Sequence, residues 1–235
     1  NLIFTTRKNY LEELNYQIFE GFHVIPKNIS IDIITHDELY DISTKFSFNL
    51  PNDEKLTELI RNPFYLNEYL KYYNEKEELN YIEFKEKLWN QKISKFKPDR
   101  EQCFIRMAFS RVTTGQFYIS NNNESSVLLD ELISDGILGY ETAGYFITHD
   151  IYEEWALEKL ISSAYKTKES NNHFFGEIGA SLPVRRSLRN WLSEQLLLEH
   201  HEIKGFVEEI IDSSEVETYW KDEILVSVLL SSYSE

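Results

Sequence analysis

Along most of the chain, apolar residues recur at the three- and four-residue spacing of amphipathic helices. Beyond residue 150 this spacing predicts helices over 151–165, 174–181, 185–198, 203–211 and 220–231. Before that point it predicts a helix through Leu11, Leu14, Ile18 and Phe19, helical text from Asp37 to about Tyr73, an amphipathic helix over 81–96 with Ile82, Leu88, Trp89 and Ile93 inward, and a helix over 100–112. The pattern therefore predicts a mainly α-helical protein with small β elements.

Two helix starts carry recognisable capping residues. Thr35 can cap the helix that follows, with Glu38 completing a capping box. Asn62-Pro63 ends one helical run and starts another, because Asn caps well and Pro suits the first helical position.

Short apolar runs predict strands over 2–6, 29–33, 116–119, 137–140 and 145–148. The last two alternate around the turn 141–144, which indicates a β-hairpin. The order of helix, strand 116–119, helix 125–134 and hairpin is that of a winged helix. A buried strand cannot form a sheet alone, so the opening run also suggests a fragment of a larger α/β domain.

The composition is acidic, with 24 Lys and Arg against 40 Asp and Glu and a formal charge of −16. This charge argues against non-specific binding to DNA or to anionic membranes. We find no signal peptide, and the apolar run 224–230 is too short to span a bilayer, so a cytoplasmic setting is the default. Cys103 is the only cysteine, and its apolar surroundings predict a buried small hydrophobe.

The segment 145–155 carries the strongest candidate chemistry. His149 stands between an apolar strand and a predicted helix, where unpaired N–H groups and a partial positive charge favour anions. A histidine at this position can reach a phosphate. The alternative is a simple helix cap, since Asp150 and Glu153 have the spacing of a capping box.

The segments Leu2 to Arg7, Leu56 to Leu66 and Phe146 to Asp150, in this order, resemble the STAND class of signalling NTPases of the NACHT and NB-ARC type. The tail segments Arg185 to Leu192 and Trp220 to Leu225 look more like the bacterial antiphage members. The resemblance implies ATP or ADP with Mg as cofactor. It also implies three nucleotide-binding residues: Arg7 as a sensor arginine near the terminal phosphate, Pro63 as the lid proline near adenine, and His149 as the winged-helix histidine on the β-phosphate of ADP.

The chain departs from the family in two motifs. It holds no Gly-x-x-x-x-Gly-Lys-Ser/Thr phosphate loop and no Walker-B run before Arg7. Both would lie upstream in an intact member. No catalytic residue is therefore assigned, and we expect no ATP hydrolysis by this chain alone.

The resemblance implies four regions: the end of an α/β NTPase core over 1–35, a helical lid over 36–97, a winged helix over 98–165 and the start of a helical array over 166–235. The expected function is an ADP/ATP-controlled oligomerisation switch. Its partners would be the upstream NTPase core, further copies of itself on activation, and a protein trigger at the C-terminal helices. The alternative is a helical protein-interaction module with no nucleotide role.

Three other features do not indicate a functional site. His200-His201 does not form a metal site, because adjacent helical residues point in different directions. The cluster Arg185, Arg186 and Arg189 is expected to pair with acidic neighbours rather than to bind a partner or a nucleic acid. The second helix of the winged-helix pattern has no Lys or Arg over 124–134, so DNA binding is not expected.

Overall fold

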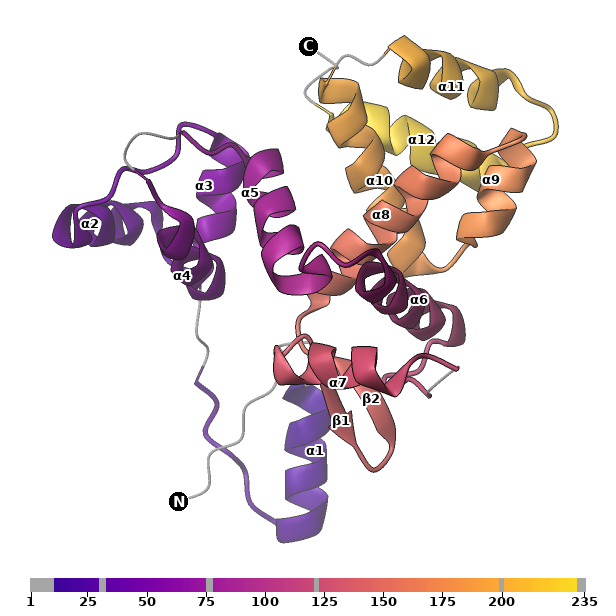
Figure 1. The fold of residues 1–235 in the computed structure, drawn as a ribbon. Helices are drawn as coiled ribbons and strands as arrows, with labels where there is room; N and C mark the ends of the chain where they lie inside the picture. Colours follow the sequence, from indigo (N-terminus) through magenta and orange to yellow (C-terminus); the bar gives the residue numbers. More distant parts are fainter. Residues whose placement is uncertain (1–10, 30–32, 75–77, 121–122, 199–200, 232–235) are drawn as a thin grey trace. The chain divides into compact units, whose positions relative to one another are not determined.

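The computed structural model describes residues 11–29, 33–74, 78–120, 123–198 and 201–231. The chain divides into two compact units, residues 1–84 and 85–235. Helices predominate in both, as the hydrophobic pattern predicts, and the described strands form one small antiparallel sheet (Figure 1).

The first unit contains α1 (Leu11–Phe22), α2 (His36–Phe46), α3 (Glu54–Ile60), α4 (Pro63–Tyr72) and the first half of α5 (Tyr81–Leu88). Both predicted caps are confirmed. Thr35 and Glu38 form a full capping box at α2, and the Asn62 side chain accepts a hydrogen bond from the backbone N–H of Phe64 at 2.9 Å. Helix α3 packs on α4 around a small core of fully or nearly fully buried side chains: Leu39, Leu56, Ile60, Leu66 and Tyr69.

The strands predicted in this unit are not observed in its described part. Ile29 and residues 33–35 belong to no strand, and residues 30–32 lie outside the described residues. Residues 2–6 and Arg7 also lie outside them, so their predicted roles stay predictions.

The helix predicted over 81–96 is observed in two forms. The α-helical turns of α5 end at Leu88, and a π-helix, η2 (Trp89–Ser94), continues to a left-handed residue at Lys95. Leu88, Trp89 and Ile93 are buried as predicted. The inward placement of Ile82 was wrong: this residue is 36% exposed, because Phe84 occupies the buried face.

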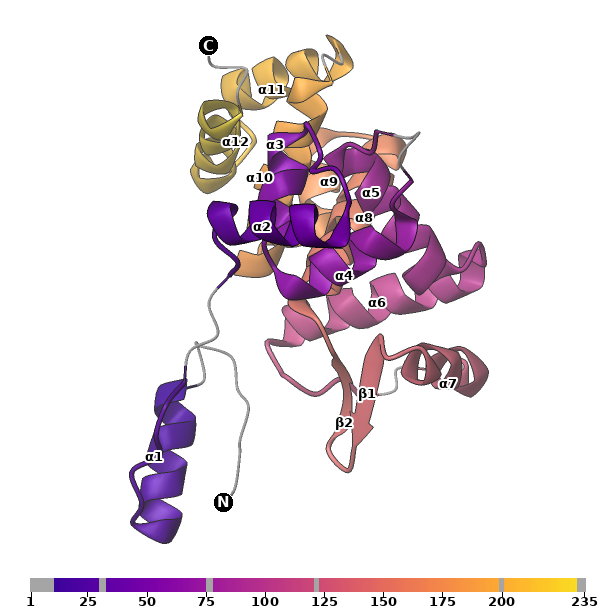
Figure 2. The ribbon, with the colours of Figure 1, turned by 90° about the vertical axis from the view of Figure 1, so that its left-hand side faces the viewer.

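The next elements of the second unit are α6 (Pro98–Thr114), α7 (Ser126–Ser134), β1 (Leu138–Glu141) and β2 (Gly144–Ile147). The hairpin is confirmed, with Leu138 opposite Ile147, and β1 packs beside α7 (Figure 2). The strand predicted over 116–119 is reduced to a single bridge between Ile119 and Tyr145. The N–H and C=O of Ile119 bond the C=O and N–H of Tyr145 at 2.7 and 3.0 Å.

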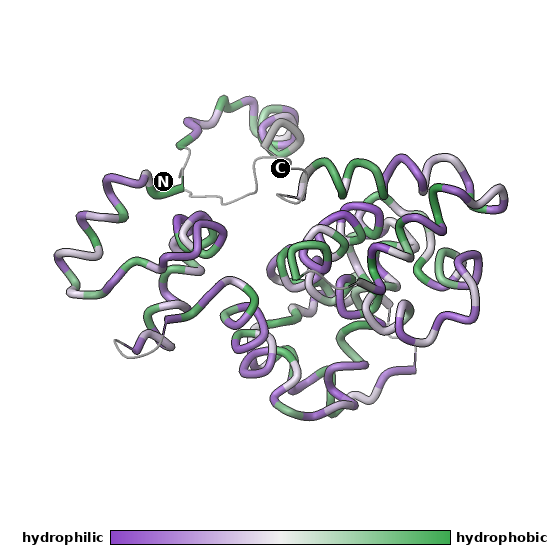
Figure 3. The backbone as a smooth tube through the Cα atoms, turned by 90° about the horizontal axis from the view of Figure 1, so that it is seen from above, coloured by the Kyte–Doolittle hydropathy of each residue, from purple (hydrophilic) through white to green (hydrophobic). Residues whose placement is uncertain are grey.

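The rest of the second unit is a stack of helices: α8 (Asp150–Thr167), α9 (Asn171–Ile178), α10 (Leu182–Leu197), α11 (His201–Asp212) and α12 (Thr218–Leu230). Helix α10 packs on both α8 and α12, and α8 also packs on α6 (Figure 1). Hydrophobic and hydrophilic residues are interspersed along each helix, as burial of one helix face requires (Figure 3).

Three tryptophans contribute to the core of this stack. Trp155, Trp191 and Trp220 are all buried, and Phe175 stacks on Trp220 with ring centroids 4.6 Å apart. Cys103 is likewise fully buried on α6. Among the described residues, no helix combines the length and apolar content needed to cross a membrane.

Candidate functional site at the start of helix α8

The backbone that leads into α8 is fixed by Thr148. Its N–H donates to the carbonyl of Ile137 at 3.1 Å, and its hydroxyl donates to the carbonyl of Gly136 at 2.7 Å. These bonds tie the end of β2 to the residues just before β1. The next residue, His149, therefore leaves the hairpin at a defined point.

His149 lies at the surface, directly before the first turn of α8. Its backbone is extended, and its carbonyl accepts from the N–H of Tyr152 at 3.1 Å. Its ring stands edge-on to Tyr152, with centroids 5.4 Å apart. Tyr152 is buried whereas His149 as a residue is exposed, so the imidazole lies against a core side chain at the protein surface.

The prediction that Asp150 caps this helix was wrong. Asp150 is the first helical residue, and the preceding position, His149, makes no side-chain cap hydrogen bond. The carboxylate of Glu153 instead pairs with the guanidinium of Arg111, whose Nη1 also lies 4.0 Å from Asp150. Arg111 on α6 thus pairs with the Glu153 carboxylate, which the capping box would have used.

This arrangement sets the electrostatics of the helix start. The N-terminus of α8 carries the positive end of the helix dipole, which favours anions. Two carboxylates in the first turn oppose that effect, and Arg111 offsets one of them. Arg111 is itself held over the ring of Phe117 at 5.5 Å. Sequence reasoning missed Arg111, because it lies on a different helix and no local pattern links it to residue 153.

The two other residues assigned by resemblance belong to the first unit, whereas His149 belongs to the second. Pro63 is the exposed first residue of α4 in the first unit, where it performs the predicted structural task of starting a helix. Arg7 lies outside the described residues. The nucleotide roles of Arg7, Pro63 and His149 stay predictions.

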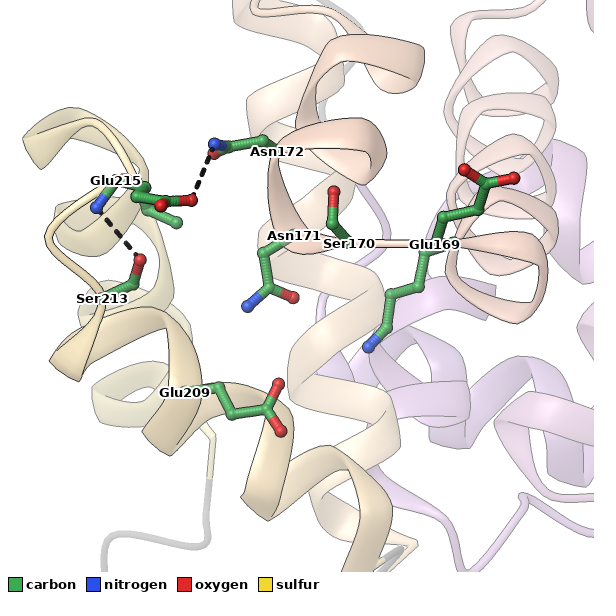
Figure 4. Close-up of a pocket in the computed structure, with 9 residues that line it drawn as sticks. Glu169, Ser170, Asn171, Asn172, Glu209, Ser213 and Glu215 are labelled. Carbon is green, nitrogen blue, oxygen red and sulfur yellow. Dashed lines mark hydrogen bonds between the residues drawn. The ribbon is translucent and has the colours of Figure 1, made fainter.

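An open pocket of the second unit lies elsewhere, where α9 begins and α11 ends (Figure 4). Asn172 donates to Glu215 at 3.4 Å, and the backbone N–H of Glu215 donates to the hydroxyl of Ser213 at 3.1 Å. Glu169 and Glu209 also line the pocket. Lys168 lies among these carboxylates, so the pocket carries charges of both signs.

The arginines of α10 pair with acidic neighbours, as predicted. Arg185 Nε donates to Glu223 at 2.7 Å, and Arg189 Nη1 lies 3.1 Å from the same carboxylate. Arg186 lies 3.6 Å from Glu154. The cluster therefore holds α10 against α8 and α12, and its cations are engaged within the protein.

The charged residues of helix α7, Asp130 and Glu131, are both acidic, so this helix would repel DNA phosphates. In the described part of the chain, no three His, Cys, Asp or Glu side chains gather as metal ligands; His200 lies outside that part. A comparison with protein-family models and with curated proteins finds no match to this chain.

Proposed function

We propose that this chain is the regulatory part of a STAND-type ATPase, in which His149 senses the phosphates of bound ADP. The observation that carries the proposal is the position of His149, exposed at the start of α8 and held there by Thr148 and Tyr152. A phosphate at this helix start would meet an imidazole donor together with the helix dipole.

The order of elements around the histidine supports the same proposal. Helix α6, the bridge at Ile119, helix α7 and the β1–β2 hairpin follow each other as in a winged helix. In the proposed mechanism this module is a clamp, since α7 offers no cation to DNA. The remaining phosphate contacts, with Mg, would come from a phosphate loop upstream of this chain.

The proposed switch depends on a contact that exists in one state only. A ligand biases a conformational equilibrium only through differential contacts with the two states. With ADP bound, His149 would hold the resting state; after exchange for ATP, the clamp would rotate away and expose an oligomerisation surface. A charged hydrogen bond contributes about 1.5–3 kcal/mol, or roughly ten- to hundredfold in affinity.

The test is His149→Ala in the full-length protein, with ADP retention and basal signalling as readouts. We expect faster loss of ADP and raised basal activity. The matched control is His173→Ala, which removes another exposed histidine from the first turn of a helix, α9. Retention equal to that of the wild type and the control would refute the role of His149.

A helical protein-interaction module is the second candidate function. Apolar side chains at the ends of α10 and along α12 favour it, because Leu197, Leu198, Leu225 and Leu229 are all exposed. The gene sequence upstream of Asn1 separates the two candidates. A phosphate loop there supports the switch, whereas its absence supports the interaction module.

A further inference from the structure

Arg111 connects the segment after α6 to the first turn of α8. It lies in the last turn of α6, and its side chain is only 14% exposed. The guanidinium pairs with Glu153 in the first turn of α8 and lies 4.0 Å from Asp150, the first residue of that helix. The central carbon of the guanidinium also lies 5.5 Å from the ring centroid of Phe117.

Phe117 extends this contact to the hairpin by aromatic stacking. Its ring is nearly parallel to that of Phe146 on β2, with an interplanar angle of 20° and centroids 5.7 Å apart. The Phe146 ring lies against Gly139, its partner on β1, where an added Cβ would collide with the ring. A continuous series of contacts thus runs from the first turn of α8, through Arg111 and the two rings, to both strands.

The side chains in this series suit their contacts. A planar guanidinium can pair with a carboxylate and also lie on an aromatic face, which an ammonium group does less well. Phe117 is 41% exposed and lies outside any helix or strand, so its contacts with Arg111 and Phe146 contribute to its position. The hairpin and α8 are therefore joined here by side-chain packing at the protein surface as well as by the chain itself.

His149 lies in the short connection that these contacts bracket. It follows the end of β2 at Ile147 by two residues and directly precedes Asp150, the start of α8. Its carbonyl accepts from the N–H of Tyr152, and its ring stands edge-on to the Tyr152 ring. A change in the angle between the hairpin and α8 would therefore move His149 relative to the helix start.

We propose that Arg111 is a positioning residue for His149: it holds the hairpin against the first turn of α8 and thereby fixes the orientation of the imidazole. This inference rests on the proposed function, in which His149 contacts the phosphates of ADP. Arg111 acts through His149 rather than on the phosphate, because its guanidinium is engaged by Glu153. Without Arg111 the imidazole adopts other orientations, and its phosphate contact forms less often.

The first test needs no nucleotide and uses NMR of the histidine ring protons. The Tyr152 ring shifts the signals of the neighbouring imidazole, so the His149 signals, identified by their loss in His149→Ala, report the edge-on contact. In Arg111→Met we expect them to move toward the positions of a histidine in an unfolded chain. The matched control is Arg106→Met, which removes another α6 arginine, 57% exposed and paired with Glu124, and should leave the signals unchanged.

Two further variants separate positioning from a general loss of stability. Phe117→Leu removes the stacking surface but keeps the pair of Arg111 with Glu153, and it should shift the His149 signals in the same direction as Arg111→Met. Arg111→Lys keeps the charge but not the planar fork, so it should restore the wild-type signals only in part. Tryptophan fluorescence shows whether each variant is folded, because all four tryptophans lie in the second unit. If Arg111→Met does not fold, the other two variants carry the test.

The second test measures the rate of ADP release from the full-length protein. Substitutions that act on a ligand through other residues change its binding by about two- to thirtyfold, and we expect faster release in that range for Arg111→Met. Shifted ring signals together with faster release support the inference. Unchanged signals in the folded variants would overturn it, as would wild-type release in Arg111→Met when His149→Ala releases ADP faster. Wild-type release in His149→Ala refutes the proposed function itself, and the inference falls with it.

Discussion

Replacement of Arg100 by methionine should destabilise the second unit more than any other removal of a single positive charge on α6. The Arg100 side chain is fully buried. Its Nε donates to the carbonyl of Ile93 at 2.6 Å and its Nη2 to that of Lys92 at 3.0 Å. These carbonyls belong to the π-helix, so the guanidinium satisfies acceptors that a following helical turn would otherwise take.

The expected loss of stability follows from the groups that lose a partner in the variant. The acidic partners of Arg100, Glu131 and Asp135, keep Lys97 and Lys95 respectively, and both are partly exposed. The two carbonyls lose the guanidinium as a side-chain donor, at about 1–3 kcal/mol each for a buried unsatisfied group. Because the acidic partners keep other cations and are partly exposed, the two carbonyls account for the loss, and we expect about 2–6 kcal/mol in total for Arg100→Met.

Urea unfolding followed by tryptophan fluorescence measures this loss in the second unit. Lys97→Met is the control, since it removes only a surface pair with Glu131, at 2.9 Å, for an expected cost below about 1 kcal/mol. Arg100→Lys keeps the charge but not the planar fork, so its loss should be intermediate. Stability of Arg100→Met within about 1 kcal/mol of the wild type would refute the assigned role.

Two further predictions concern the region from α6 to the β1–β2 hairpin. Gly144→Ala should break the bridge to Ile119, because φ is +134° and a new Cβ would lie 2.8 Å from the Ile119 carbonyl oxygen. Amide hydrogen exchange at Ile119 and Tyr145 should then accelerate. Gly136→Ala, with no atom near its new Cβ, should leave both amides protected. Burial, reinforced by the carboxylate of Glu124, raises the pKa of the Cys103 thiol to about 12. A thiol reagent at pH 8 should therefore label this residue only after unfolding, and rapid labelling of the folded chain would contradict this.

The features that the sequence predicts correctly are those decided within a few residues. Thr35 with Glu38, and Asn62 with Pro63, start helices through contacts inside one turn. The hairpin around residues 142–143 likewise depends on adjacent strands. Asp150 fails as a cap because its companion Glu153 binds Arg111, 42 residues earlier in the chain, and local spacing contains no information about such a partner.

The same distinction explains why the buried charges escaped prediction. A lysine or glutamate in a helical pattern indicates the solvent-facing side, because an unpaired charge is rarely buried. Lys85 is a buried residue whose ammonium group donates to the carboxylates of Glu158 and Glu194, 73 and 109 positions away in the chain. Periodicity thus predicts which segments are helical, whereas long-range ion pairs determine how α5, α8 and α10 are joined. The proposed role of His149 also rests on a local feature, the order of strand, histidine and helix, and it stays a prediction.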